Sequence, residues 1–308
     1  MLTSATFDAL RTHFGDRLQE NVPLSSYTSA RIGGPADALL VVRSAKEIVE
    51  AATKLWEWNV PFLLLGGGSN VLVSDKGVRS VVLLNRARLV KFDSQAGQPT
   101  VYAESGATMN DIAQRAARLG LAGLEWAASI PGSIGGAVYG NAGAFGGEVS
   151  TSLVSVDLLF RHGRESWPVE KMGYGYRTSV LKRERSGALL LGCKLCLTQG
   201  DKEAIQSKMA ENSERRRRTQ PPGASMGSMF KNPPGEKAGR LLEAAGLKGT
   251  HIGGAEVSTQ HANFFINTEN TRAEDMKALL ELAQKTVFEK FGITLEPEIE
   301  IVGEWLEQ

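Results

Sequence analysis

Ile130-Pro-Gly-Ser-Ile-Gly-Gly-Ala-Val-Tyr-Gly-Asn-Ala-Gly-Ala-Phe-Gly-Gly-Glu148 is the stretch that decides the fold of this chain. Seven glycines lie between Pro131 and Gly147. A turn does not need so many, and each glycine adds to the conformational entropy that is lost on folding. A large flat ligand pressed against the backbone explains this density better than a purely structural turn does.

A second glycine loop, Gly66-Gly-Gly-Ser-Asn70, follows the apolar run Phe62–Leu65, which predicts a buried strand. Consecutive glycines let backbone N–H groups converge on an anion, and a phosphate can approach without a Cβ in the way. A plain tight turn would explain this loop equally well. Neither loop contains Gly-x-Gly-x-x-Gly, and no Gly-Lys pair forms a P-loop, so a nucleotide bound here uses neither common cradle.

Apolar periodicity around the loops predicts a mixture of helices and strands. Ser44-Ala-Lys-Glu47 is a capping box that opens one helix, and Thr108 opens another that Gly120 is placed to end. A long amphipathic helix opens at Thr271-Arg-Ala-Glu274. The predicted strands lie at 36–43, 62–65, 71–73, 81–84, 101–104, 153–161, 188–197 and 295–302, and the other helices at 203–218 and 236–245.

Length and composition bound the class of protein. A chain of 308 residues is long for one hydrophobic core, so two or three domains are expected. The formal net charge of +1 argues against nucleic acid or a membrane as the main partner. The N-terminus mixes charged and apolar residues, unlike a signal peptide, and no stretch approaches ~20 apolar residues. The cytoplasm is the expected compartment.

The chain contains two cysteines, Cys193 and Cys196. Their Cys-x-x-Cys spacing suits a redox pair or half a zinc site, but they lie in the predicted strand 188–197, where residues three apart point to opposite faces. No second Cys or His pair completes a zinc site. We therefore expect buried or half-buried inert thiols and no metal site; so few cysteines suit a reducing compartment.

The basic run Arg215–Arg218 is the feature that most suggests nucleic acid. It ends a predicted helix, where cations favour the helix dipole, and the overall charge is nearly neutral. We expect a solvated helix end, partly turned toward a diphosphate. His261 lies in Gln-His-Ala-Asn263 and is assigned no chemistry.

The motifs taken together resemble those of the UDP-N-acetylenolpyruvoylglucosamine reductases. The most specific are Gly-Ser-x-Phe-Lys-Asn-Pro, here Gly227–Pro233, and Pro-Gly-x-x-Gly-Gly-Ala, here Pro131–Ala137. The length resembles the shorter form of that family. The remaining matching motifs follow in order at 28–37, 65–72, 174–179, 239–249 and 295–303.

The resemblance implies an α+β class: a vanillyl-alcohol-oxidase-type FAD-binding fold of two α+β subdomains, plus a C-terminal α+β substrate-binding domain. It implies subdomain 1 at 1–88 with 294–308, subdomain 2 at 89–202 and the substrate-binding domain at 203–293. It also implies non-covalent FAD, NADPH as the hydride source and a UDP-sugar substrate whose enolpyruvyl group is reduced to a lactyl ether during peptidoglycan precursor synthesis. We expect a monomer without nucleic-acid or membrane partners.

Three catalytic residues follow from the same resemblance. Ser228 matches the proton donor, Arg177 matches an arginine that holds carboxylate, and Glu298 matches an acid that hydrogen-bonds the developing enolate. The implied substrate-binding residues are Tyr176, Lys231 and Asn232. The implied FAD-binding residues are Gly66, Gly67, Gly68, Ser69, Asn70, Pro131, Gly132, Ser133, Gly135, Gly136, Asn141, Ala142 and Gly143.

Each catalytic candidate also has a plain alternative. Ser228 could be a turn serine, Arg177 a surface arginine and Glu298 a solvated carboxylate. The family usually carries a basic residue two positions after the glutamate, whereas this chain has Glu300, so substrate anchoring near the tail is open. Two other functions stay possible at this stage: another FAD-dependent oxidase or dehydrogenase of the same fold, and a catalytically silent nucleotide-binding protein.

Overall fold

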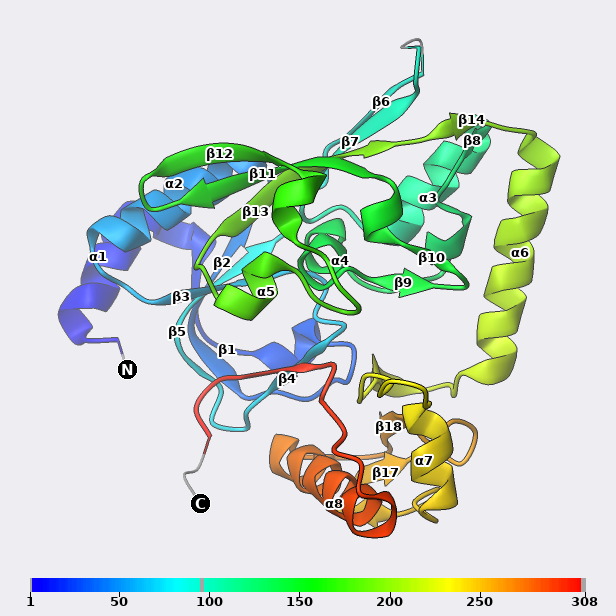
Figure 1. Cartoon of the computed structure of the whole chain (residues 1–308). Coiled ribbons are helices and arrows are strands. Elements are labelled where there is room, and N and C mark those ends of the chain that lie inside the picture. Colours follow the sequence, from blue (N-terminus) through cyan, green and yellow to red (C-terminus); the bar gives the residue numbers. More distant parts are fainter. Residues whose placement is uncertain (1, 95–96, 306–308) are drawn as a thin grey trace. The chain divides into compact units, whose positions relative to one another are not determined.

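The computed structural model describes residues 2–94 and 97–305 (Figure 1). They form two compact units. The first comprises residues 2–39, 68–82 and 217–305, and the second comprises 40–67, 83–94 and 97–216. Strands β2 (Pro35–Val42) and β5 (Val78–Asn85) and the end of helix α6 (Lys202–Thr219) run through the division, so each unit contains part of all three.

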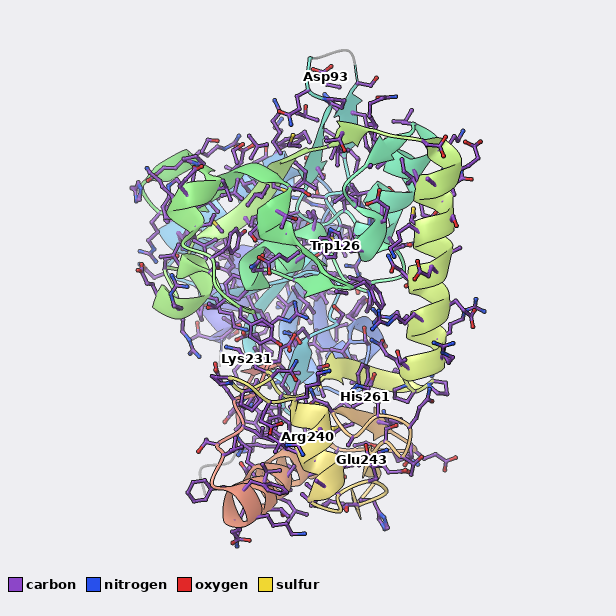
Figure 2. All side chains as sticks on the ribbon, turned by 45° about the vertical axis from the view of Figure 1, so that its right-hand side comes forward. Asp93, Trp126, Lys231, Arg240, Glu243 and His261 are labelled. Carbon is purple, nitrogen blue, oxygen red and sulfur yellow. The ribbon has the colours of Figure 1, made fainter. Side chains whose placement is uncertain are left out.

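The first unit contains an antiparallel sheet in the order β15-β18-β17-β16, and helix α8 packs against β16 and β17. Helix α7 packs against α8, and His261 lies beside α7, whose Arg240 and Glu243 are labelled in Figure 2. The elements are α1 (Ser4–Phe14), η1 (Gly15–Arg17), β1 (Leu18–Pro23), η2 (Leu24–Tyr27), β4 (Val71–Val73), β15 (Ala224–Ser228), α7 (Ala238–Ala244), β16 (His251–Ile252), β17 (Ala255–Val257), β18 (Phe264–Asn267), α8 (Ala273–Phe291) and β19 (Glu300–Val302).

The tail of the chain is less regular than its sequence predicts. Only Glu300–Val302 form a strand, which pairs in parallel with β4. The expected strand over 295–302 is therefore wrong in its first five residues. Pro297 lacks a backbone N–H and cannot donate to a ladder, and the Leu295 carbonyl instead accepts a hydrogen bond from Gln284 at 2.8 Å.

The start of α8 also differs from the prediction. The helix begins at Ala273 rather than at Thr271. The Thr271 hydroxyl bonds the Asn267 side chain, so it does not cap the helix. The two Asp75 carboxylate oxygens accept hydrogen bonds from the backbone N–H groups of Ala273, at 2.8 Å, and Glu274, at 3.0 Å. A distant carboxylate thus satisfies amides that a helix leaves without partners.

Replacing Asp75 by Ala removes this cap and the favourable charge at the helix N-terminus. We expect the free energy of unfolding to fall by about 1–2 kcal/mol, measured as a lower urea midpoint. Glu289→Ala is the matched control, because it removes an exposed charge from the same helix and should change stability by less than about 0.5 kcal/mol. Equal effects of the two substitutions would contradict the capping role.

The second unit contains an antiparallel sheet in the order β12-β11-β13-β7-β6, with α4 packed against β13 and β7. Strands β2, β5 and β3 are neighbours in that order. The elements are α2 (Ala45–Glu57), β3 (Phe62–Leu65), β6 (Val90–Asp93), β7 (Thr100–Glu104), α3 (Met109–Arg118), β8 (Leu121–Ala122), η3 (Glu125–Ala127), α4 (Ile134–Gly140), β9 (Gly143–Ala144), β10 (Gly147–Glu148), η4 (Val149–Thr151), β11 (Leu153–Phe160), β12 (Gly163–Pro168), η5 (Val169–Met172), α5 (Val180–Glu184), β13 (Leu189–Cys196), β14 (Thr198–Gln199) and α6 (Lys202–Thr219).

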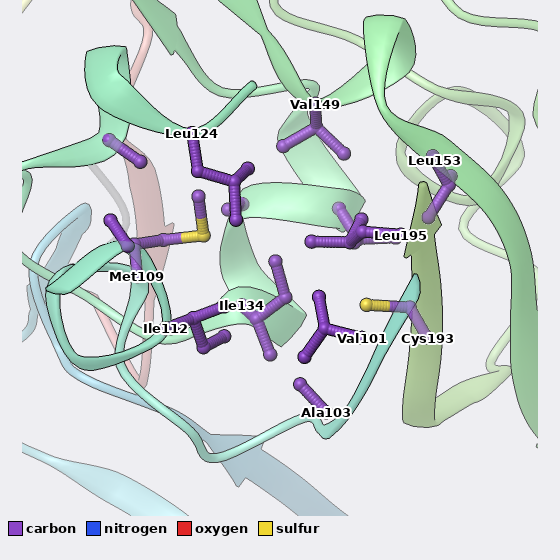
Figure 3. Close-up of a cluster of buried hydrophobic side chains, with 14 of the residues drawn as sticks. Val101, Ala103, Met109, Ile112, Leu124, Ile134, Val149, Leu153, Cys193 and Leu195 are labelled. Carbon is purple, nitrogen blue, oxygen red and sulfur yellow. The ribbon is translucent and has the colours of Figure 1, made fainter. Parts of the chain in front are cut away.

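The core of the second unit lies between its sheet and helices α3 and α4 (Figure 3). Ile112 of α3 and Ile134 of α4 point toward Val101 and Cys193 of the sheet. Burial raises the pKa of the Cys193 thiol to about 12, so this group stays protonated and unreactive at neutral pH. Cys196 is half-buried and both cysteines are free, which confirms the prediction of buried or half-buried thiols.

Helix starts in the second unit agree with the sequence. The Ser44 hydroxyl accepts the Glu47 N–H at 3.2 Å, and the Thr108 hydroxyl accepts the Asp111 N–H at 3.2 Å. Strands β11 and β13 are also confirmed within one residue of their predicted ends. Among residues 2–94 and 97–305, no helix has both the length and the apolar composition that a bilayer span requires.

Candidate active site

The two glycine loops meet in the second unit. A Cβ added to Gly66 would lie 2.4 Å from the Ser133 hydroxyl oxygen, and one added to Gly67 would lie 2.7 Å from the Cα of Gly132. Real Cβ atoms do not come so close to other heavy atoms. At Gly67 the neighbouring atoms belong to the backbone, so the packing there requires glycine, whereas at Gly66 the neighbour is the Ser133 side chain. The end of β3 and the start of α4 are thereby joined by loops that are 66 residues apart in the chain.

The first loop continues into the first unit, where it is also tightly packed. A Cβ on Gly68 would lie 2.0 Å from the Tyr27 carbonyl oxygen, and the Gly68 carbonyl accepts the Ser29 N–H at 2.9 Å. Gly68 has φ +63, which favours glycine. Asn70 donates its side-chain amide to the Glu298 carbonyl at 3.1 Å. Asn70 therefore ties this loop to the segment that contains the predicted acid.

The second loop forms the start of α4 and the β9–β10 hairpin. The Ser133 hydroxyl accepts the Gly136 N–H and caps α4. Three of its glycines are required by neighbouring protein atoms: an added Cβ would lie 2.8 Å from Ser105 O at Gly135, 2.6 Å from Gly147 O at Gly143, and 2.3 Å from a Trp126 ring carbon at Gly147. Close packing of the chain on itself thus explains part of the glycine density.

Other glycines of the same loop face open space. Gly140 and Gly146 have no atom within 4 Å of an added Cβ, and the exposed Gly136 has only the Ser133 hydroxyl at 3.8 Å. Gly67, in the neighbouring loop, is also exposed. A bare backbone open on one side and rigidly packed on the other fits the approach of a large planar or phosphate-bearing group. The residues present therefore fit a bound flavin nucleotide.

The predicted arginine segment is docked on the second glycine loop. Four hydrogen bonds join residues 174–179 to residues 138–143. Three are donated by the arginine segment: the Tyr174 hydroxyl to Val138 O at 2.9 Å, the Ser179 hydroxyl to Tyr139 O at 2.6 Å, and the Arg177 guanidinium to Gly143 O at 2.7 Å. The fourth is donated by the Asn141 side-chain amide to Gly175 O at 3.2 Å. Burial raises the pKa of Tyr174, which stays a neutral donor. The arginine segment, residues 174–179, therefore packs as a unit with the second glycine loop.

Arg177 has an unusual backbone conformation. Its φ of +54 lies in the left-handed region, which costs energy for a residue with a side chain. Its guanidinium lies 5.5 Å from the centroid of the Tyr176 ring, a cation–π distance, while Tyr176 itself is 52% exposed. Residues kept in strained conformations cluster at functional sites, and this one presents a fixed cation beside the glycine loop.

The Asn141 side chain holds the end of α4 to two neighbouring segments through hydrogen bonds. Asn141 is buried, ends α4 in the left-handed region with φ +47, and accepts the Ser150 N–H at 3.0 Å through its side-chain oxygen. Both ends of its amide are thus bonded to backbone, one to Ser150 and one to Gly175. Ala142 and Gly143, which follow, are half-buried.

Ser228 ends strand β15 in the first unit. It pairs with Phe264 of β18 after a register shift that starts at Ser225, and Gly227 before it has φ +77. Such a bulge re-aims the side chain that follows it. Ser228 is half-buried, between the buried Met226 and Met229.

Glu298 is held next to the Ser228 segment. Its backbone N–H donates to the Met229 carbonyl at 2.8 Å, and Phe230 forms an isolated bridge with Pro297. The Lys231 N–H donates to the Glu296 carbonyl at 2.9 Å. The structure therefore brings two of the three predicted catalytic residues, Ser228 and Glu298, into adjacent segments of the first unit. Arg177 belongs to the second unit.

The residues after Ser228 have partners of their own. The Lys231 ammonium forms an ion pair with Glu296, the lysine side chain 13% exposed and the glutamate 69% (Figure 2). The Asn232 side chain accepts the Ala238 N–H at 3.0 Å, at the start of α7. The motif therefore both carries Ser228 and fixes the helix that follows it.

Asn263, in Gln-His-Ala-Asn263, is a site residue that the sequence does not reveal. Asn263 is 4% exposed and bonds the backbone of Phe230, two residues after Ser228. Burial lowers the pKa of the neighbouring His261, whose Nδ1 accepts the Asn263 N–H at 3.2 Å. A single amide in an irregular segment has no periodic signal, so only the fold could identify it.

The basic run at the end of α6 is largely exposed to solvent. Arg215, Arg217 and Arg218 are exposed and Arg216 is half-buried, as expected for a solvated helix end. In the described part of the chain, no group of three or more His, Cys, Asp or Glu side chains is arranged to hold a metal ion.

Two family models match the chain. An FAD-binding domain matches residues 36–167, and the C-terminal domain of UDP-N-acetylenolpyruvoylglucosamine reductase matches residues 219–302. The first range contains both glycine loops, and the second contains Ser228 and Glu298. These matches confirm the predicted FAD-binding fold of the vanillyl-alcohol-oxidase type and its α+β class.

Whole-chain similarity points to the same family. The UDP-N-acetylenolpyruvoylglucosamine reductase of Rubrobacter xylanophilus is 44% identical over 285 residues, which are 92% of this chain and 94% of that protein. The one of Bacillus subtilis is 41% identical over 285 residues, 92% and 93% of the two chains. The crystal structure of the Thermus caldophilus enzyme is 36% identical, covers 92% of this chain and 98% of its own, and superposes with a TM-score of 0.79. The chain therefore belongs to the UDP-N-acetylenolpyruvoylglucosamine reductase family.

Proposed function

We propose that this chain reduces the enolpyruvyl group of UDP-N-acetylglucosamine enolpyruvate to the lactyl ether of UDP-N-acetylmuramate, a step of peptidoglycan precursor synthesis. The observation that carries the proposal is the joint position of Ser228 and Glu298. A hydrogen bond between Glu298 N–H and Met229 O holds their segments together, within the region that matches the reductase C-terminal domain.

FAD, held by the two glycine loops, would supply the hydride chemistry, in which hydride from NADPH reaches the vinyl carbon of the substrate. Negative charge then develops on the adjacent carbon and its carboxylate. The Arg177 guanidinium is suited to bind that carboxylate because its planar fork is always charged. A protonated Glu298 would hydrogen-bond the enolate oxygen.

Ser228 completes the reaction by giving its hydroxyl proton to the carbon next to the carboxylate. A C–H bond forms and the serine O–H bond breaks, after which solvent returns a proton to the serine oxygen. One hydride and one proton are thereby added across the double bond. A serine is a weak acid, but a carbanion is a strong enough base to take its proton.

We further propose non-covalent FAD contacts from the open backbone at Gly67 and Gly136, together with the other predicted residues of both loops. Tyr176, Lys231 and Asn232 would contact the substrate. The three-domain division at 1–88 with 294–308, 89–202 and 203–293, a monomeric state and a cytoplasmic location belong to the same proposal; the free thiols suit a reducing compartment.

The test is a pair of half-reactions followed by flavin absorbance. Purified protein is expected to be yellow and to bleach with NADPH under anaerobic conditions. Adding the enolpyruvyl sugar nucleotide should restore the oxidised spectrum within one turnover. If air restores it rapidly and the sugar nucleotide does not, the chain is an oxidase instead; a colourless protein that binds no FAD would overturn the proposal.

A further inference from the structure

The backbone that carries Ser228 is held from both sides. On one side, the tail of the chain bonds it: Glu298 N–H donates to Met229 O at 2.8 Å and Lys231 N–H donates to Glu296 O at 2.9 Å. On the other side, beyond Ser228, the regular pairing of β15 with β18 stops. Residues 229–230 there need partners that no strand provides.

Asn263 provides those partners. Its backbone carbonyl accepts the Met229 N–H at 2.8 Å. Its side-chain oxygen accepts the Phe230 N–H at 3.0 Å, and its side-chain nitrogen donates to Phe230 O at 2.8 Å. The amide thus pairs with Phe230 in both directions, as the peptide group of a neighbouring strand would.

This pairing is buried and specific for an amide. Asn263 is 4% exposed and Phe230 is 1% exposed, so water does not replace a lost hydrogen bond there. An amide offers a donor and an acceptor side by side, whereas an ionised carboxylate offers acceptors only. Leaving either backbone group of Phe230 without a partner carries the full cost of its desolvation.

We propose that Asn263 is a positioning residue for the reaction: it fixes the backbone after Ser228 and so sets where the serine hydroxyl and Glu298 lie relative to each other. The inference rests on the proposed function, because it assigns Asn263 a role through Ser228. The connection runs from the Asn263 amide to Phe230, and through the Met229 carbonyl to Glu298.

The first experiment compares Asn263→Ala with Asn267→Ala. Asn267 is the matched control: it ends strand β18, which begins directly after Asn263, is half-buried and also makes two side-chain hydrogen bonds, donating to Ala30 O and accepting from Thr271, both at 2.8 Å. N263A should slow flavin reoxidation by the enolpyruvyl sugar about 10²-fold, the effect expected of a misplaced reacting group. Reduction by NADPH should change less than about threefold, and N267A should leave both rates within about threefold.

A double variant separates positioning from general destabilisation. If Asn263 acts through Ser228, N263A combined with S228A should be no slower than S228A alone, because residues that act as a unit are not additive. Independent effects that multiply would overturn the proposal. So would an N263A reoxidation rate equal to that of N267A. If S228A itself reoxidises at the normal rate, the proposed function of the site fails instead.

Asn263→Asp keeps the test usable if N263A does not fold. The aspartate retains the acceptor for Phe230 N–H and loses only the donor to Phe230 O. Its reoxidation rate relative to the unaltered protein should rise as pH falls from 8 to 5.5, because a protonated carboxyl group regains an O–H donor. A flat ratio across that range, with correctly bound FAD, would contradict the positioning role.

Discussion

Replacing Ser228 by Ala should slow reoxidation of the reduced flavin by the enolpyruvyl sugar nucleotide about 10³-fold, within the range that a positioned proton donor contributes. Reduction of the flavin by NADPH should keep its rate, because that half-reaction needs no proton from this serine. Rapid-mixing measurement of both half-reactions checks the result. The substitution should leave the local structure intact, because Ser228 is half-buried at a strand end and its pairing with Phe264 is made by the backbone, which alanine retains.

Ser225→Ala is the control for this prediction. Ser225 is a half-buried serine on the same strand, paired with Ile266 of β18. It should leave both half-reactions within about twofold, because it stands before the bulge that re-aims Ser228. Equal losses of both half-reactions in S228A would point to damaged FAD binding and remove the serine from the role of proton donor.

The local parts of the fold could be predicted because their signals are local. The capping box at Ser44–Glu47 gave the start of α2, and the apolar run at Phe62–Leu65 gave β3. The start of α8 was misplaced, because its local capping box lies at Arg272 and Asp275 and its first two amides bond Asp75, which is 198 residues away from Ala273. Where a partner is distant in sequence, a plausible local cap such as Thr271 misleads.

The glycine loops show a similar limit. The density of the second loop predicts a large flat ligand, and both loops lie within the range that matches an FAD-binding domain. The sequence could not separate glycines required by the chain's own packing, such as Gly67 against Gly132, from those that face open space, such as Gly140. Both kinds look alike in a sequence, because the approach of two backbones is a property of the folded chain.

The predicted catalytic set came from the family motif, and its geometry came from the structure. No spacing rule relates Ser228 to Glu298, whose segments are held together by contacts such as the hydrogen bond from Glu298 N–H to the Met229 carbonyl. Lys231, three residues after Ser228, has its ammonium ion-paired with Glu296. Any effect of Lys231 on Ser228 would act through a charge that this carboxylate partly offsets.

Arg177 allows charge and backbone strain to be tested separately. Arg177→Ala removes the guanidinium but keeps a side chain at φ +54, whereas Arg177→Gly removes the guanidinium and relieves the left-handed conformation. Both should lower kcat/KM for the enolpyruvyl sugar about 10²–10³-fold, the loss expected when one fixed electrostatic group is deleted. R177G should be more stable than R177A by up to about 1 kcal/mol.

Arg177→Lys completes the series. A lysine keeps the positive charge but not the planar fork that can bind a carboxylate while another of its nitrogens donates to Gly143 O. Its kcat/KM should therefore fall between those of the unaltered protein and R177A. If R177G regained the activity that R177A lacks, the backbone conformation would carry the role; if R177K were fully active, charge alone would suffice and the bond to Gly143 would be dispensable for catalysis.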